Sequence, residues 1–351
     1  MRVYTINFIC YFNMSIESFK QRQFFPRRFG INESRIHLYG APKSGKSSIA
    51  LYYTKQFKNP IYIDFNDFRN SLESIKNTLL KVSMEKRVDI LVLDNLPEDF
   101  TSLPNIKNII TISEKQSSKF TNKEILPLSF EEFISFDKSS QNINTLLNEF
   151  IKYGNLPQSI FLKESQKEQN KQDALRLIFG DKISFALYIL NLQGKVISIN
   201  QIYSNLKKIT KISKDFIYSF IESLQERNII YLVPNILSQK LPKKLLLFDF
   251  SLRQVISYER DFLALFENML FMELKRFKKP IFYAKNINLI CNNKGYILAP
   301  FNTKDSIKAM LERIDLFDLE IIILTLDLES SLKIGNKLIK IKSFINFALD
   351  E

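Results

Sequence analysis

The stretch GAPKSGKS, at residues 40–47, fits the pattern GxxxxGK[ST] without a gap. Before it stands the apolar stretch RIHLY, residues 35–39, which predicts a strand, and after it SSIALYYTKQF, residues 47–57, which predicts a helix. In such a strand–loop–helix turn the backbone N–H groups converge on phosphate oxygens, and the dipole of the helix adds to the attraction. The sequence therefore predicts a phosphate-binding loop on an α/β core.

We expect this loop to bind ATP rather than to be a glycine-containing turn without a ligand. Lys46 is expected to reach the β- and γ-phosphates, and the Ser47 hydroxyl to bind Mg²⁺. His37 lies inside the preceding strand, and we interpret it as a packed residue without a catalytic role. The expected nucleotide contacts are Gly40, Ala41, Pro42, Lys43, Ser44, Gly45, Lys46, Ser47 and Ser48.

The run VDILVLDN, residues 88–95, is continuously apolar up to Asp94, as expected of a buried parallel strand. Such a strand carries the acid that holds Mg²⁺ in P-loop ATPases, so Asp94 is the expected second metal ligand. The next residue, a glutamate in members that hydrolyse ATP, is here Asn95, which cannot accept a proton. Glu98 follows one turn later and is an alternative acid.

A further apolar strand is predicted at residues 106–113, followed directly by a polar stretch at 114–124. Ser113, at the end of that strand, is the expected polar sensor of the nucleotide. No Gly-Arg pair follows that could supply an arginine to the phosphates. The sequence thus predicts nucleotide binding, with hydrolysis that is slow or absent.

Two segments, ILPLSFEEFISF at residues 125–136 and FIKYGNLPQSI at 150–160, carry a family resemblance. The chain resembles prokaryotic AAA-type ATPases in which a P-loop domain is followed by a winged helix and a C-terminal endonuclease-like domain. The resemblance extends over residues 35–349, and Asn155 replaces one glycine of the second motif. The matching residues are Pro127, Leu128, Ser129, Phe130, Glu132 and Phe133, and then Tyr153, Gly154 and Pro157.

The middle of the chain has the element order of a winged helix. Helices are predicted at residues 181–192, 198–210 and 213–228, and strands at 228–235 and 243–250. Ser198 and Gln201 form a capping-box pattern, and Ser213 can cap the third helix. Two interpretations stay open: the module contacts duplex DNA, or it covers the nucleotide as an internal lid. The lysines that would meet phosphates are Lys207, Lys208, Lys211 and Lys214.

The last third resembles the family's endonuclease-like domain of the PD-(D/E)xK type. Glu267 matches the acid on its opening helix. The strand that carries metal-binding acids in other members has Asn286 and Asn288 here, and the next strand ends at residues 298–301 without its acid and lysine. Because amides bind Mg²⁺ more weakly than carboxylates, the resemblance implies a degenerate domain that is not a nuclease.

Composition adds limits on the whole chain. With two cysteines and one histidine in 351 residues, the sequence predicts no zinc cluster, no disulfide framework and a reducing, cytoplasmic setting. No apolar run approaches the roughly 20 residues of a membrane span, and the first dozen residues do not resemble a signal peptide. The net charge of +13 favours an anionic partner or reflects a lysine-rich coding background. Met14 is an alternative start, which would exclude residues 1–13.

We therefore expect an α/β P-loop domain with a parallel sheet, a winged helix and a small endonuclease-like α/β domain. The expected boundaries are 1–30 for an N-terminal segment, 31–162, 163–250 for linker and winged helix, and 251–351. The expected function is an ATP-binding protein in which the nucleotide switches the arrangement of the domains. The alternatives are a nucleic-acid-binding regulator with incidental ATP, and a decayed relative that holds ADP permanently.

Overall fold

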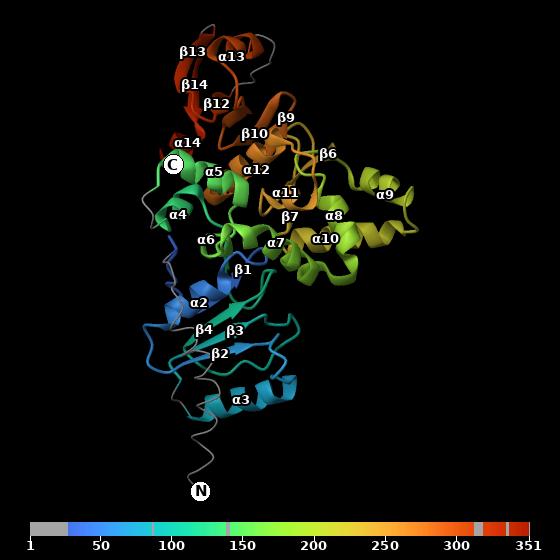
Figure 1. Ribbon diagram of the computed structural model, residues 1–351. Helices are drawn as coiled ribbons and strands as arrows, with labels where there is room; N and C mark the ends of the chain where they lie inside the picture. Colours follow the sequence, from blue (N-terminus) through green and yellow to red (C-terminus); the bar gives the residue numbers. More distant parts are fainter. Residues whose placement is uncertain (1–26, 86–87, 138–140, 312–318, 335–336, 351) are drawn as a thin grey trace. The chain divides into compact units, whose positions relative to one another are not determined.

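The computed structural model describes residues 27–85, 88–137, 141–311, 319–334 and 337–350 (Figure 1). The expected start at Met14 and the segment before residue 27 lie outside this range. The chain divides into two compact units, of which the first runs to Leu126 and includes Glu226–Asn228. The second comprises Pro127–Gln225 and the residues from Ile229 onward. Within the described ranges, no helix combines the length and the apolar character needed to cross a bilayer.

The first unit is built on a five-stranded sheet in which every pairing is parallel, with strand order β2-β3-β4-β1-β5. This is the mixed α/β architecture predicted from the sequence, with the glycine-containing loop between β1 and α2. The elements are β1 (Arg35–Tyr39), α2 (Lys46–Thr54), β2 (Pro60–Asp64), α3 (Leu72–Glu85), β3 (Ile90–Asp94), β4 (Asn108–Ile112) and β5 (Thr121–Glu124).

Helices cover both faces of this sheet (Figure 1). Ile49 and Ala50 of α2 pack with Tyr62 and Val92 on one face. Ile75 of α3 packs with strand residues on the other face. Strands buried on both faces need apolar residues at successive positions, which explains the continuous apolar run of β3.

The strand β5 was not predicted, because its residues lie in the polar stretch at 114–124. It pairs in parallel with β1 at the edge of the sheet, with the register Leu38↔Lys123. Thr121 and Asn122 are exposed there. An edge strand with one solvated side carries polar and charged side chains, so the hydrophobic pattern gave no signal.

The second unit begins with helices and a small sheet. Strand β8 pairs antiparallel with both β6 and β7. Both bonds of the predicted capping box between Ser198 and Gln201 are present, and the Ser213 hydroxyl accepts a bond from Phe216 N. The elements are α4 (Phe130–Ser135), α5 (Ile143–Tyr153), α6 (Gln158–Phe161), α7 (Glu164–Phe179), η1 (Gly180–Lys182), α8 (Ile183–Leu190), β6 (Val196–Ile197), α9 (Ile199–Lys207), α10 (Lys214–Glu226), β7 (Ile230–Val233) and β8 (Lys243–Leu247).

A six-stranded mixed sheet completes the second unit, with strand order β13-β14-β12-β11-β10-β9. The run from Ala264 to Leu274 on α12 is buried all round, as expected of a helix enclosed by its own unit. The elements are α11 (Leu252–Ile256), α12 (Phe262–Leu274), η2 (Lys275–Phe277), β9 (Ile281–Ala284), β10 (Ile287–Cys291), β11 (Lys294–Leu298), α13 (Lys304–Leu311), β12 (Glu320–Thr325), β13 (Ser330–Ile334), β14 (Lys337–Ser343) and α14 (Phe344–Asp350).

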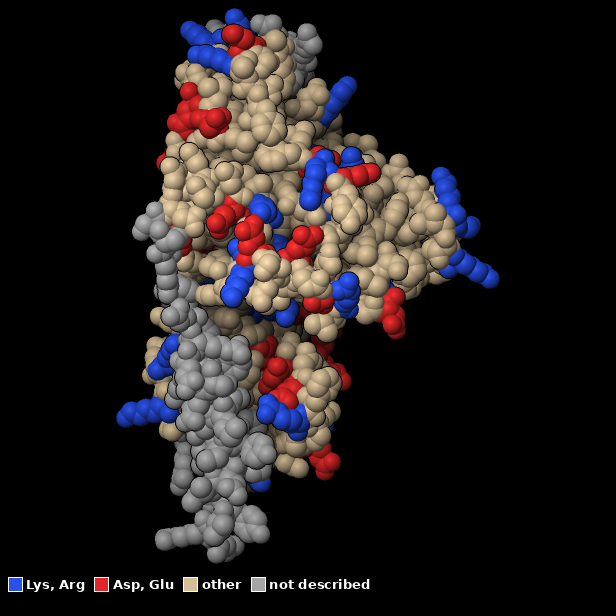
Figure 2. All heavy atoms as spheres, viewed as in Figure 1, with Lys and Arg blue, Asp and Glu red and all other residues tan. Residues whose placement is uncertain are grey.

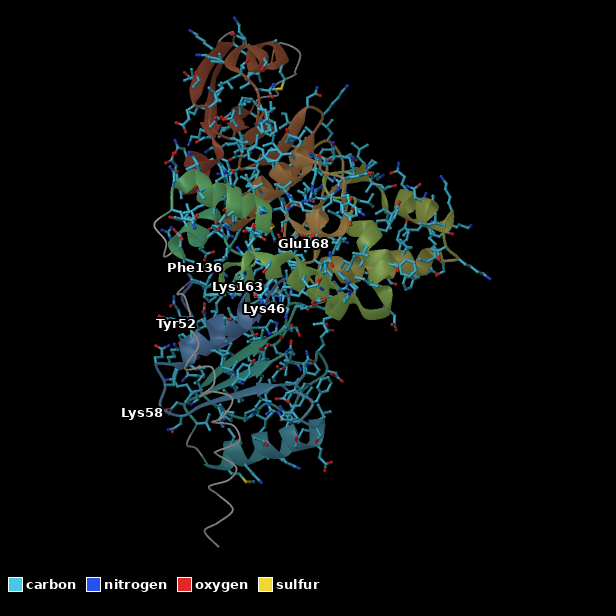
Figure 3. All side chains as sticks on the ribbon, viewed as in Figure 1. Lys46, Tyr52, Lys58, Phe136, Lys163 and Glu168 are labelled. Atoms are coloured by element: carbon cyan, nitrogen blue, oxygen red, sulfur yellow. The ribbon has the colours of Figure 1, made fainter. Side chains whose placement is uncertain are left out.

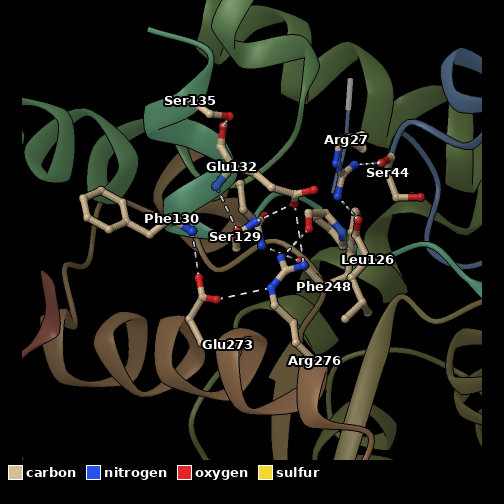
Figure 4. Close-up of polar contacts among 12 residues, drawn as sticks. Arg27, Ser44, Leu126, Ser129, Phe130, Glu132, Ser135, Phe248, Glu273 and Arg276 are labelled. Atoms are coloured by element: carbon tan, nitrogen blue, oxygen red, sulfur yellow. Dashed lines mark hydrogen bonds and ion pairs between the residues drawn. The ribbon is translucent and has the colours of Figure 1, made fainter. Parts of the chain in front are cut away.

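The segment PLSFEEF, part of the family resemblance, has a structural role within the second unit. Ser129 and Glu132 form a capping box at the start of α4. Phe130 N donates to Glu273 Oε1 over 2.9 Å, and Arg276 donates to the carbonyl of Pro127 over 2.6 Å (Figure 4). These contacts tie the motif to the end of α12 and to η2.

The second segment of the resemblance, residues 150–160, also has a structural role, because its residues Gly154 and Asn155 are closely packed. Gly154 has φ 76°, and a Cβ atom at this position would lie 2.2 Å from Asp249 Oδ1. Asn155, which departs from the family pattern, is fully buried, and its side-chain amide donates to the carbonyl of Phe248 over 3.2 Å. The backbone carbonyl of Asn155 accepts a hydrogen bond from Leu128 N over 2.8 Å, which links the two motifs.

Candidate nucleotide site

The loop between β1 and α2 depends on two glycines. Gly40 has φ 137°, and a Cβ there would lie 2.5 Å from the backbone oxygen of Ile125. Gly45 has φ 98° and stands directly before α2, and Lys43 adopts φ 61°. The amide of Gly40 donates to the carbonyl of Glu114 over 3.3 Å. A larger residue at Gly40 would push β5 away from the loop.

The first turn of α2 offers backbone donors to an anion. The helix begins at Lys46, and the cap residue Gly45 provides no side-chain hydrogen bond to it. The first N–H groups of an α-helix have no acceptor within the helix, and they point along its positive dipole end. The start of α2 therefore has the geometry that binds phosphate elsewhere.

The side chain of Lys46 turns back toward the loop. Its ammonium donates to the carbonyl of Gly40 over 2.8 Å and to that of Ala41 over 2.7 Å. Burial lowers the pKa of Lys46 to about 8, against the opposing attraction of Glu114 and Asp94. A buried cation held by two neutral carbonyls is poorly compensated, so an anion in the loop would stabilise it.

Ser44 provides a second sign that the loop fits a ligand. Its side chain is fully buried, and its hydroxyl has no hydrogen-bond partner among the described residues. Arg27 fixes the backbone here, donating to the carbonyl of Ser44 over 3.1 Å and to that of Leu126 over 3.0 Å (Figure 4). An unpaired buried hydroxyl beside a buried ammonium suits the oxygens of a triphosphate.

The other predicted contacts lie on the same turn. Ala41 and Pro42 are buried, Lys43 and Ser48 are exposed, and Ser47 is half-buried. The residues at positions 40–48 thus form one continuous loop and helix start, as the sequence predicted, and their contact with a nucleotide stays a prediction.

Asp94 ends β3 on the face that α2 covers. Its carboxylate accepts from Tyr62 Oη over 2.5 Å and from Asn95 N over 2.9 Å, and the nearby Ser47 hydroxyl lowers its pKa. Burial raises the pKa of Asp94, and the nearby carboxylate of Asp64 adds to the shift, while these donors oppose it. The two predicted metal ligands, Ser47 and Asp94, are therefore side by side.

The two residues considered for hydrolysis, Asn95 and Glu98, differ in their surroundings. Asn95 has φ 55° and donates through its side chain to Asp64 Oδ1 over 2.8 Å. Glu98 is largely exposed and forms an ion pair with Lys115 at 3.0 Å. The side chain of Asn95 thus contacts an acid that the sequence analysis did not consider.

His37 is buried in β1, in agreement with its interpretation as a packed residue. Its Nδ1 lies 2.8 Å from the Thr111 hydroxyl, and its Nε2 lies 2.8 Å from the carbonyl of Lys115. Burial lowers the pKa of His37, and the positive charge of Lys46 adds to this, although the bond to Lys115 opposes it. The hydroxyl of Ser113 donates to the same carbonyl over 2.8 Å.

Three residues of this site were missed by sequence reasoning, namely Arg27, Tyr62 and Asp64. Tyr62 and Asp64 lie on β2, whose stretch PIYIDF, residues 60–65, indicates a strand but no polar role. A signal was available, because alternate positions of a strand share a face and Asp64 ends its strand as Asp94 ends β3. No sequence pattern pointed to the contacts of Arg27 with the carbonyls of Ser44 and Leu126.

The second unit contains a polar cluster where the resemblance placed a degenerate nuclease site. Glu267 is buried and paired with the ammonium of Lys244. Asn288 donates to Glu267 over 2.9 Å and accepts from Leu298 N over 3.0 Å. A cavity of about 610 Å³ lies beside it, lined by Lys244, Asn286, Asn288, Ser306 and apolar residues. In the described part of the chain, no three His, Cys, Asp or Glu side chains group as metal ligands.

No family model matches the chain. An uncharacterized protein of Methanocaldococcus jannaschii is 27% identical over 307 residues, which cover 72% of this chain and 69% of that protein. The structure of the Aeropyrum pernix ORC1 protein in complex with DNA has a TM-score of 0.30 and 12% identity, over 66% of this chain and 88% of that chain.

Proposed function

We propose that the chain binds ATP with Mg²⁺ at residues 40–48 and that the bound nucleotide switches the arrangement of the two units. The observation that carries the proposal is the buried ammonium of Lys46, which donates only to loop carbonyls among the described residues. An anionic ligand would replace these neutral acceptors with charged ones, and charge-assisted hydrogen bonds are the stronger ones.

Different residues of the site would bind the phosphates and the metal ion. The amides at the start of α2 and the Ser44 hydroxyl would bind phosphate oxygens, and Lys46 would bridge the terminal phosphates. Ser47 and Asp94 would hold the metal ion. Bound Mg²⁺ would neutralise charge on the β- and γ-phosphates. Asn95 cannot accept a proton, so any turnover is slow.

For the second unit, we propose a winged helix made of α8, α9, α10 and the pair β7–β8, followed by a degenerate endonuclease-like domain. The cluster around Glu267 supports the loss of nuclease chemistry. The ammonium of Lys244 stands beside the one matching carboxylate, and Asn288 contributes an amide where an acid is expected. A cation already pairs with the acid, so a metal ion would have to displace it.

A nucleic-acid-binding function is the second candidate. Lys207, Lys208, Lys211 and Lys214 are all exposed around the turn between α9 and α10. Figure 2 shows basic side chains gathered at this end of the helix pair, at the right of the view. Such a cluster favours contact with phosphates of a duplex. Duplex binding that weakens with salt and is lost on neutralising Lys207, Lys208 and Lys211 would support this function, and no binding at low salt would exclude it.

The test of the leading proposal uses one purified sample of the full chain. Its nucleotide content is measured first, and ATP and ADP are then titrated with and without Mg²⁺. We expect reversible ATP binding that Mg²⁺ strengthens. A co-purifying ADP that does not exchange would instead support a permanent structural nucleotide, and no binding of either nucleotide would refute the site.

A further inference from the structure

Asp64 and Asp94 end neighbouring strands at the same edge of the sheet. Their Cα atoms are paired in the parallel register of β2 and β3. Paired residues on parallel strands direct their side chains to the same face of the sheet. A second carboxylate therefore lies beside the predicted metal ligand.

This is the face that α2 covers, where the phosphate-binding loop ends. Tyr62, two residues before Asp64 on β2, packs with Ile49 of α2, and its hydroxyl reaches Asp94. Ile63, between them, packs with α3 on the opposite face. The alternation along β2 thus places Asp64 on the side of Ser47 and of the expected phosphates.

The carboxylate of Asp64 is held in place on one oxygen. Asn95 Nδ2 and Asn66 N both donate to Oδ1, over 2.8 Å and 2.9 Å. Among the described residues, no hydrogen bond ends on its Oδ2. The asparagine that cannot act as a base therefore orients a carboxylate that can, and one oxygen of that carboxylate is available to a water molecule.

We propose that Asp64 orients the water that attacks the γ-phosphate and accepts its proton, with Asn95 as the residue that positions its carboxylate. This proposal rests on the ATP-binding function proposed above. In the step, the water oxygen forms a bond to the γ-phosphorus while the bond from that phosphorus to the bridging oxygen of the β-phosphate breaks. The water proton passes to Asp64 and then to solvent, and ADP and inorganic phosphate leave.

Other acids near the loop are less suited to this role. Glu98 is exposed and engaged by Lys115. Glu114 follows β4, and its carboxylate is paired with the guanidinium of Arg227. Asp64 alone combines a place beside Asp94 with a hydrogen bond from Asn95. The experiment therefore includes Glu114→Gln, which tests whether Glu114 is the base instead.

The experiment measures phosphate release and nucleotide binding on the same samples of the full chain. We expect Asp64→Asn to keep the thermal shift caused by MgATP and its dependence on Mg²⁺, while phosphate release falls by about 10²-fold or more. ATP recovered from this variant should remain intact. Asp64→Ser should give the same loss. Asp67→Asn, three residues beyond Asp64, removes the ion pair with Arg69; it is the matched control and should turn over ATP normally.

Several results would overturn the proposal. They are normal phosphate release by Asp64→Asn, a loss of release by Glu114→Gln in its place, and a wild-type protein that binds MgATP without ever releasing phosphate. Loss of the Mg²⁺ dependence in Asp64→Asn would make Asp64 a metal ligand instead. Failure of the wild type to bind MgATP at all would refute the ATP site itself, which is a separate outcome.

Discussion

The hydroxyl of Tyr62 donates a hydrogen bond of 2.5 Å to the buried carboxylate of Asp94 on the neighbouring strand. Tyr62 therefore stabilises the acid that the sequence predicts to be a metal ligand. Burial and the negative charge of Asp94 raise the pKa of Tyr62. The tyrosine therefore keeps the proton that it donates in this bond.

We expect Tyr62→Phe to lower the free energy of unfolding by about 1.5–3 kcal/mol, the usual effect of removing a hydrogen bond to a charged group. Urea denaturation of the ligand-free protein measures it. Tyr52→Phe is the matched control, because Tyr52 is 44% exposed on α2 (Figure 3). An equal change in both variants would contradict the role of the bond.

Asp94→Asn should separate metal binding from nucleotide binding. An amide is a weak ligand for Mg²⁺, so the strengthening of ATP binding by Mg²⁺ should fall at least about tenfold. Binding measured in EDTA should change little. Asp89→Asn, close to the opposite end of β3, is the control and should keep the Mg²⁺ effect. A full Mg²⁺ effect in Asp94→Asn would remove Asp94 from the metal site.

His37 offers a direct observation of the strand beside the loop, because the chain has a single histidine. Its pKa in the folded protein should lie below 6.5, and Lys46→Ala should raise it, since the charge of Lys46 lowers it. The unfolded chain then takes up this proton first as the pH falls below 6.5, so stability decreases with acidification. Proton NMR of the imidazole measures the titration, and a pKa of 6.5 or higher would contradict the buried, neutral assignment.

The buried pair of Lys244 and Glu267 should behave as a unit. Lys244→Met leaves Glu267 charged and unpaired, which should cost about 3–5 kcal/mol of stability. Adding Glu267→Gln should recover part of that loss, because no charge is then left buried. A double-mutant cycle in urea measures the coupling. A loss below about 1 kcal/mol for Lys244→Met would contradict the pairing.

The parts of the fold that depend on local sequence were predictable. The loop at residues 40–47 and its flanking strand and helix follow from glycine positions and apolar runs. The caps at Ser198 and Ser213 need only a side chain and an amide within one turn, so the sequence predicted both. The buried strand β3 follows from its unbroken apolar run.

The contacts that cross between strands were not predictable in the same way. Asp64 meets Asn95 only because β2 and β3 are neighbours in the sheet, and a linear pattern does not give the strand order. Lys244 likewise reaches Glu267 from β8, 23 residues earlier in the chain, and no pattern in the sequence relates the two. The strand β5 escaped prediction because an exposed edge requires no apolar residues.

The most direct measurement of the central claim is the thermal shift that MgATP causes in the wild type and in Lys46→Ala. At 100 times its dissociation constant, a ligand stabilises the folded state by about 2.7 kcal/mol. We expect this shift in the wild type and in Lys58→Ala, an exposed lysine of the same unit (Figure 3), but not in Lys46→Ala. An unchanged shift in Lys46→Ala would contradict a triphosphate site at this loop.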